Sequence, residues 1–188
     1  TAIPPETPLL PGETLGNPGL DVLDVPAVAS IAHAHGVPLL VDSTFTTPWL
    51  MKHFEHGADL VFHSATKFLS GHGTVVGGIV VDGGSFDWDG PRAAGRFAEL
   101  TAPYAGFHNM VFTDESTVGA FLLRARREGL RDFGACLSPH SAWLVLQGIA
   151  SRLLSVPLSS RFLSLVDKAA SAARRRGIAA SLVIEKVS

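Results

Sequence analysis

The fold is decided by residues 59–67, which read DLVFHSATK. The stretch starts with three apolar residues, a length and composition that predict a short buried strand. It then changes at once to polar residues, among them the hydroxyls of Ser64 and Thr66 and the amine of Lys67. A lysine just past a buried strand is expected to be partly sheltered from water, where its amine can lose its proton near neutral pH and attack an aldehyde. The alternative is a loop lysine flanked by turn hydroxyls.

Length and composition predict one sizeable core, with room for a second small unit. The chain has 188 residues, of which 46% are hydrophobic, and its mean hydropathy is +0.28. It has no apolar run of roughly eighteen residues that could span a bilayer, so the apolar excess is assigned to a buried parallel sheet and no membrane partner is expected. A net charge of −2 without a basic block argues against nucleic acid. The single cysteine, Cys136, excludes an internal disulfide, and no signal peptide is visible, so a cytoplasmic location is predicted.

Strands and helices alternate through the first part of the chain. Residues 9–10 are a weak strand candidate, because a proline follows them. A helix is predicted over residues 24–36, and a buried strand over residues 37–41. A second helix is predicted over residues 47–56, before the strand at residues 60–62. This alternation predicts right-handed βαβ units, and therefore a mostly parallel sheet flanked by helices.

The pattern changes after the lysine. A strand over residues 77–81 follows too soon for a helical crossover, so it is predicted to run antiparallel to its predecessor. Residues 82–113 form a long excursion rich in glycine and aromatic residues, and a loop of that length is usually functional. Helices are predicted over residues 114–127 and from residue 138 onward. Residues 162–174 carry only weak helical periodicity.

Two pairs of histidines have spacings that metal sites can use. His33 and His35 belong to the first predicted helix, and His53 and His56 stand at i, i+3. All four are predicted to lie on helix surfaces. No metal site is predicted.

Polar side chains follow each of the three predicted parallel strands. In chain order they are Glu13 with Asn17, Asp42 with Thr44, and Ser64 and Thr66 with Lys67. Because ligands of open α/β sheets lie outside the carboxyl ends of the strands, these side chains should surround one pocket. Pyridoxal 5'-phosphate needs such a set, in which a lysine makes the Schiff base, an aspartate pairs with the pyridinium nitrogen, and hydroxyls hold the phosphate. We therefore predict a pyridoxal-phosphate site, although Asp42 taken alone could be a turn cap.

Three segments carry a resemblance to a known family. They are residues 13–18 (ETLGNP), residues 41–48 (VDSTFTTP) and residues 63–73 (HSATKFLSGHG). All three resemble signatures of the Cys/Met-metabolism pyridoxal-phosphate enzymes, and the similarity covers roughly residues 2–149. Within that family, residues 83–108 resemble the insertion of O-acetylhomoserine sulfhydrylases. The implied fold is the large domain of aspartate-aminotransferase-like (fold type I) enzymes.

The resemblance implies a role for each matching residue. Lys67 would be the catalytic residue, first as the Schiff-base lysine and later as the proton shuttle. Asp42 would pair with the pyridine nitrogen of the cofactor. Ser64 and Thr66 would bind its phosphate.

The resemblance also implies a reaction. Asn17 would approach the ring hydroxyl of the cofactor, and Thr44 would pack close to it. Sulfide would replace the acetyl group of O-acetylhomoserine and give homocysteine, a step of methionine biosynthesis. The implied partners are this amino-acid substrate, sulfide, and further copies of the chain in a dimer or tetramer. Two alternatives stay open: a related γ-lyase or cystathionine synthase of the same family, and a non-catalytic cofactor-binding or structural remnant.

Family members carry a longer N-terminal part and a C-terminal domain. Residues 1–149 are therefore predicted to be a fragment of the cofactor-binding large domain, truncated at both ends. Residues 150–188 are predicted to be a divergent helical tail. Apolar strand residues left without cover would favour self-association and weak activity of this chain alone.

Overall fold

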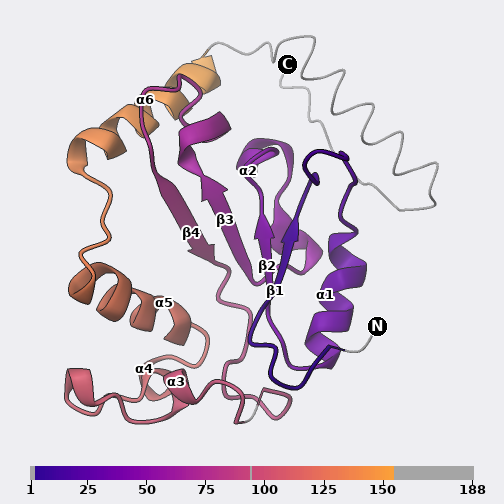
Figure 1. Ribbon diagram of the computed structural model, residues 1–188, viewed down its shortest axis with the longest axis vertical. Coiled ribbons are helices and arrows are strands. Elements are labelled where there is room, and N and C mark those ends of the chain that lie inside the picture. The colour runs from indigo at the N-terminus through magenta and orange to yellow at the C-terminus, as the bar shows by residue number, and fades with distance from the viewer. Residues whose placement is uncertain (1–2, 94, 155–188) are drawn as a thin grey trace.

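The computed structural model describes residues 3–93 and 95–154 (Figure 1). Its four strands form one sheet in the order β1-β2-β3-β4. The strands are β1 (Leu10–Glu13), β2 (Leu39–Asp42), β3 (Leu60–Ser64) and β4 (Gly78–Asp82). The first three run parallel, and β4 runs antiparallel to β3, as predicted. The predicted α/β class with a mostly parallel sheet is therefore confirmed.

The weakest predicted strand forms at an edge of the described sheet. β1 runs straight through Pro11 and pairs with β2 alone. Proline has no N–H to donate to a ladder, and an edge strand tolerates this because one side of it needs no donor. The N–H of Leu10 still donates to the carbonyl of Pro38, at 3.0 Å. The prediction of a spoiled strand was too pessimistic, because the edge position was not known.

Helix α1 (Val25–Ala34) covers one face of the sheet. It begins where predicted, because the side chain of Asp24 accepts a hydrogen bond from the N–H of Ala27 at 3.1 Å. It ends before Gly36, whose φ of +65° suits glycine. Its apolar side and the strands form one buried cluster: Val25, Ala29, Ala32, Leu39, Val41, Ala58 and Val61.

The second predicted helix is in fact two short ones. α2 covers Thr47–Leu50, and a 3-10 helix, η1, covers His53–His56. The chain is extended between them at Met51 (φ −150°, ψ 126°). This break turns His53 inward, and only 2% of its surface is exposed. The surface prediction for His53 was therefore wrong.

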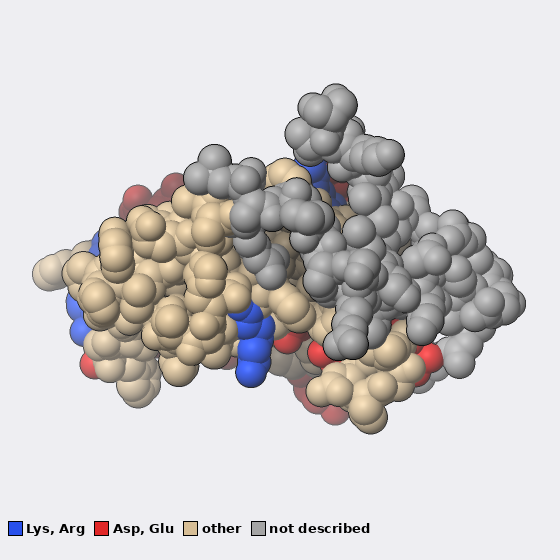
Figure 2. All heavy atoms as spheres, turned by 90° about the horizontal axis from the view of Figure 1, so that it is seen from above, with Lys and Arg blue, Asp and Glu red and all other residues tan. Residues whose placement is uncertain are grey.

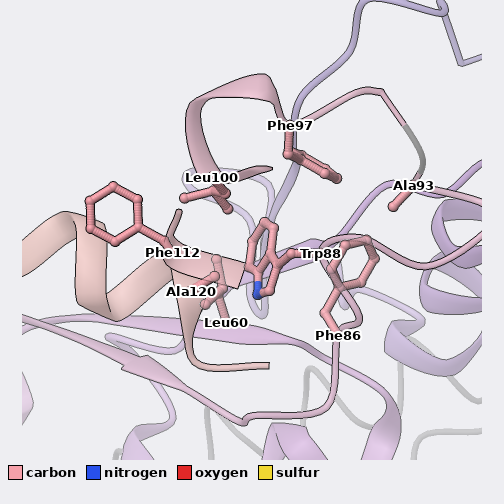
Figure 3. Packing of buried hydrophobic residues seen from close by; sticks show 8 residues of the cluster. All are labelled: Leu60, Phe86, Trp88, Ala93, Phe97, Leu100, Phe112 and Ala120. Carbon is pink, nitrogen blue, oxygen red and sulfur yellow. The ribbon is translucent and has the colours of Figure 1, made fainter. Parts of the chain in front are cut away.

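The excursion after β4 forms a second core on the other face of the sheet. Strand side chains alternate between faces, so Leu60 points away from α1 while its neighbour Val61 points toward it. Leu60 packs into an aromatic cluster in which the ring centroid of Trp88 lies 4.9 Å from that of Phe86 and 5.1 Å from that of Phe97 (Figure 3). The excursion also contributes α3 (Ala98–Thr101), η3 (Ala105–Phe107) and α4 (Phe112–Glu115). It therefore serves as a packing element, and the function expected of so long an excursion stays a prediction.

The last described elements follow α4. The helix predicted over residues 114–127 is divided between α4, α5 (Ala120–Ala125) and a π-helical segment, η4 (Arg126–Asp132). α6 (Pro139–Leu154) begins where predicted and lies beside the upper end of β4 in Figure 1.

The predicted boundary between residues 149 and 150 falls inside α6. It stays a prediction, since residues 155–188, with the periodicity at 162–174, lie outside the described residues. Within the described part of the chain, no helix has both the length and the apolar character needed to cross a membrane.

The aromatic cluster gives the first testable prediction. Phe112 is fully buried in it, whereas 84% of the surface of Phe133 is exposed. Phe112→Ala should lower the free energy of unfolding by about 3–5 kcal/mol, because it removes apolar contacts and leaves a cavity. The matched control Phe133→Ala should change it by less than about 0.5 kcal/mol. Urea unfolding of the full chain measures both, and equal effects would contradict the assignment of this core.

Candidate functional site

The carboxyl ends of β1, β2 and β3 open into one cavity of about 660 Å³. The three ends lie side by side because Glu13 pairs in register with Asp42, and Asp42 with Phe62. The cavity brings together all six site residues predicted from the sequence: Asn17, Asp42, Thr44, Ser64, Thr66 and Lys67. This is the edge of the sheet at which open α/β proteins bind their ligands.

Asp42 ends β2 with its carboxylate half-buried at the cavity. Its Oδ1 accepts a hydrogen bond from the N–H of Thr44, at 2.8 Å. Its Oδ2 accepts none from the residues that the structure describes. The turn cap and the ligand site were posed as alternatives, but one oxygen can serve the turn while the other serves a ligand.

Thr44 connects the ends of β2 and β3. Its hydroxyl oxygen accepts a hydrogen bond from the N–H of Ser64, at 2.7 Å. The hydroxyl of Ser64 itself makes no hydrogen bond to the described part of the chain. Thr44 therefore fixes the backbone of Ser64 and leaves the Ser64 hydroxyl available to a ligand.

The hydroxyl of Thr66 is already engaged. It donates to the carbonyl of Gly77 at 3.3 Å and accepts from the N–H of Gly77 at 3.0 Å. The longer of these bonds is near the limit for a hydrogen bond to oxygen. An anion in the cavity could therefore take the hydroxyl hydrogen of Thr66 from Gly77 at small cost.

Lys67 lies in η2, a π-helical turn over Ala65–Leu69, where its own backbone departs from helical geometry (φ −90°, ψ −120°). Its side chain lines the cavity but is exposed. The turn carries Lys67 three residues past the end of β3 to the rim of the cavity, where the expected partial shelter of its amine stays a prediction. Among the described residues, the amine has no ion-pair partner.

Asn17 reaches the cavity from the loop that follows β1. Its N–H donates to the carboxylate of Glu13 at 3.3 Å, and both residues are exposed. The loop is closed by the N–H of Gly16, which donates to the carbonyl of Asp21 at 2.8 Å. Glu13 thus lines the cavity and also helps to hold the loop that carries Asn17.

A layer of buried polar side chains lies beneath the cavity, and no pattern in the sequence predicted it. The hydroxyl of Thr14 donates to the carbonyl of Asp42 at 2.9 Å and lies 3.0 Å from Nε2 of His53. Because Thr14 has one hydroxyl hydrogen, His53 must be the donor in the second contact, with its proton on Nε2. The hydroxyl of Thr46 lies 3.4 Å from the same nitrogen and 2.9 Å from the hydroxyl of Ser43. Within the described chain, Nδ1 of His53 has no hydrogen-bond partner.

This layer is uncharged at neutral pH. Burial, with smaller contributions from the neighbouring His56 and His63, lowers the pKa of His53 to about 4. Burial also lowers the pKa of His63, although the bond to the Ser43 carbonyl and the charge of Asp42 oppose the shift. The Asp42 backbone therefore rests on neutral hydrogen-bonded groups.

Charged side chains are sparse and mixed in sign on the described part of the face seen from above in Figure 2. This agrees with the net charge of −2.

No group of three or more His, Cys, Asp or Glu side chains in the described chain could hold a metal ion.

Comparison with known proteins identifies the family. Residues 1–159 match the family described as Cys/Met metabolism PLP-dependent enzyme, where PLP is pyridoxal phosphate. The chain belongs to this family. The match also runs past residue 149, near which the resemblance to PLP enzymes of Cys/Met metabolism was expected to end.

Relatives and solved structures agree with the family. The O-acetyl-L-homoserine sulfhydrylase of Leptospira meyeri is 48% identical over 145 residues, which cover 73% of this chain and 32% of that protein. A Campylobacter jejuni protein assigned as an O-acetylhomoserine (thiol)-lyase, solved with a pyridoxyl-lysine monophosphate, is 30% identical with a TM-score of 0.73. That similarity covers 81% of this chain and 37% of the Campylobacter chain.

A second solved structure is more distant. The cystathionine gamma-lyase of Lactobacillus plantarum, in complex with L-serine, is 29% identical with a TM-score of 0.54, over 81% of this chain and 31% of that one. Both structures are fold type I PLP enzymes, so the predicted fold type is confirmed. The chain spans about a third of the length of the curated relatives it matches.

The donor set of the cavity fits PLP. The cofactor needs an amine for its aldehyde, a carboxylate for its ring nitrogen, and hydrogen-bond donors for its phosphate. Lys67 offers an amine without an ion-pair partner in the described chain, and Asp42 offers an oxygen without a donor there. Ser64 and Thr66, which also line the cavity, offer two hydroxyls.

The neutral layer gives a prediction about pH. The pKa of His53 is lower in the folded chain (about 4) than its ordinary value of 6.5, so on acidification the unfolded chain binds this proton first. Neutral His53 makes a contribution to the free energy of unfolding that is fully present above pH 6.5. This contribution is lost as the pH falls toward 4, by roughly 3 kcal/mol in all. His53→Gln keeps a donor for Thr14 and should flatten the fall in stability between these limits.

The measurement is urea unfolding of the full chain at several pH values from 7.5 to 4.5. His35→Gln, at an exposed position, is the control and should keep the wild-type pH dependence. An unchanged slope in His53→Gln would mean that the buried imidazole does not set the acid sensitivity.

Proposed function

We propose that this chain carries the cofactor-binding part of a PLP-dependent sulfhydrylase, which uses sulfide to replace the acetyl group of O-acetylhomoserine. The observation that carries the proposal is one cavity lined by Lys67, Asp42, Ser64 and Thr66 at the carboxyl ends of parallel strands. The choice of substrate is supported by the 48% identity to an O-acetyl-L-homoserine sulfhydrylase.

Lys67 is proposed as the catalytic residue. When bound, the cofactor supplies a ring that withdraws electrons from the substrate and makes its α- and β-protons acidic. The Lys67 amine would hold the cofactor covalently and, when free, would take and return these protons at Nζ. The exposed position of Lys67 at the cavity rim suits both roles, since the amine must exchange one partner for another.

Asp42 is proposed to bind the ring nitrogen through Oδ2. Its other oxygen is held by the N–H of Thr44, so the carboxylate has a fixed orientation before any ligand binds. A hydrogen bond to a charged group of this kind contributes about 1.5–3 kcal/mol. The hydroxyls of Ser64 and Thr66 are proposed to donate to the phosphate, and Asn17 to approach the ring hydroxyl, with Thr44 close by.

The overall reaction is balanced. Hydrosulfide and O-acetylhomoserine give homocysteine and acetate. The bond between the γ-carbon and oxygen breaks, acetate leaves with the electron pair, and a carbon–sulfur bond forms at the same carbon. The proton carried by hydrosulfide ends on the new thiol.

Further copies of the chain, in a dimer or tetramer, and a cytoplasmic location belong to the same proposal. The main competitor is a lyase of the same family, which is favoured by the similarity to a cystathionine gamma-lyase. Sulfide-dependent formation of homocysteine supports the sulfhydrylase, and release of an α-keto acid without sulfide supports the lyase. The absence of both products, together with bound cofactor, would indicate a non-catalytic domain.

The role of Lys67 is tested by trapping. Added PLP should give a yellow complex with the full chain, and borohydride should fix the cofactor onto Lys67. This is expected because Lys67 lines the same cavity as the other residues proposed to bind the cofactor. Lys67→Ala should abolish the adduct. Lys52, whose side chain is 73% exposed, provides the control, because Lys52→Ala should leave the adduct intact. Peptide mapping that found the cofactor on Lys52 would refute the assignment.

The role of Asp42 is tested by Asp42→Ala. The variant should still form the Lys67 adduct but lose the pairing with the ring nitrogen. Homocysteine formation should fall several tens-fold or more, at about 1.4 kcal/mol of barrier per tenfold. Asp114→Ala, at an exposed position in α4, should keep the wild-type rate. Full turnover in Asp42→Ala would leave its carboxylate only the role of a turn cap.

A further inference from the structure

Residues 65–72, which we call the Lys67 turn, pack directly against helix α6 at Gly148. A Cβ atom added to Gly148 would lie 1.7 Å from the carbonyl oxygen of Ser70 and 2.4 Å from its carbon. Real side chains do not tolerate such distances, so only glycine allows the helix to rest on this peptide group. A glycine inside a helix costs roughly 0.5–1 kcal/mol relative to alanine. The close approach explains why this position accepts that cost.

Ser70 transmits this contact to Lys67. It is fully buried, and its hydroxyl donates to the carbonyl of Thr66 at 3.2 Å and lies 3.5 Å from that of Lys67. Its N–H donates to the carbonyl of Ala65 at 3.0 Å, and the N–H of Gly71 donates to that of Lys67 at 2.9 Å. A displacement of Ser70 would therefore move the carbonyls of the whole turn.

Two further contacts hold α6 against the same turn. Nε2 of His72 and Oγ of Ser151 are 2.8 Å apart, one helical turn beyond Gly148. On the other side, Val145 is buried in a cluster with Ala65 and Val75. The turn is thus held at its start, its middle and its end by one helix.

We propose that α6 positions Lys67 through the contact between Gly148 and Ser70. Gly148 and Ser70 are positioning residues, since neither of them lines the cavity. They fix the backbone of residues 65–72, so that Lys67 and Thr66 line the cavity. This inference rests on the proposed function, in which Lys67 binds PLP.

The test compares two glycines. Gly148→Ala in the full chain should force α6 and the turn apart and slow the borohydride-trapped attachment of PLP to Lys67 at least tenfold. Gly129→Ala is the matched control, because an added methyl group there meets nothing within 4 Å. It should leave the rate of attachment unchanged. Wild-type rates in Gly148→Ala would overturn the proposal.

A second variant keeps the contact between Gly148 and Ser70 and removes only the hydrogen bonds that the Ser70 hydroxyl makes to the turn. Ser70→Ala deletes the hydroxyl bonds to Thr66 and Lys67 while leaving Gly148 in place. It should also slow attachment, at an unfolding midpoint within a few degrees of wild type. If Gly148→Ala does not fold, this variant decides, and a wild-type rate of attachment in Ser70→Ala then overturns the proposal.

A measurement without cofactor separates this inference from the proposed function. Amide hydrogen exchange at Ser70 and Gly71 should be faster in Gly148→Ala and Ser70→Ala than in wild type, while Leu39 and Val41 in the central strand stay protected. Local loss of protection without any Lys67 adduct in wild type would support the positioning contact and refute the proposed function. Unchanged exchange at Ser70 and Gly71 would overturn the contact itself.

Discussion

The parallel register of β1, β2 and β3 is the constraint on which the cavity depends. Side chains alternate between the faces of a sheet, so a slip of one residue would turn Asp42 to the wrong side of its strand. On the face of the sheet covered by α1, the register is fixed because Leu39 and Val41 are fully buried against that helix. It is also fixed at the rim, because Thr44 accepts a hydrogen bond from the N–H of Ser64. The apolar pattern of the strands therefore decides where the polar site residues point.

The buried layer under Asp42 adds a second, polar constraint. The bond from Thr14 to the carbonyl of Asp42 extends the connection between β1 and β2 past the last paired residues. It also requires the proton of His53 to be on Nε2, and Nδ1 of that ring has no partner in the described chain. An unsatisfied buried group costs about 1–3 kcal/mol. This cost falls directly beneath the cavity, where a rigid backbone for Asp42 is worth more than optimal local stability.

The sequence was sufficient for the features that depend on local pattern. Short apolar runs ending in Asp42 and Ser64 predicted two parallel strands and a shared pocket, because the period of the side chains and the direction of the strands follow from such runs. It was not sufficient for contacts between distant segments. The buried His53 contacts Thr14, which lies 39 residues earlier in the chain, and the aromatic residues after β4 pack against Leu60. Neither partner can be read from its neighbours in the chain.

Two different parts of the fold therefore support the two halves of the proposed site. Asp42 is held by strand pairing and by the hydrogen bond from Thr14, which belongs to the layer around His53. Lys67 is held by a turn that rests on α6, through Ser70. Since the two supports share no residue, a change in α6 can alter the proposed attachment of the cofactor without altering the proposed binding of its ring. Covalent attachment and ring binding are then separable properties of this domain, and each is governed by its own set of backbone contacts.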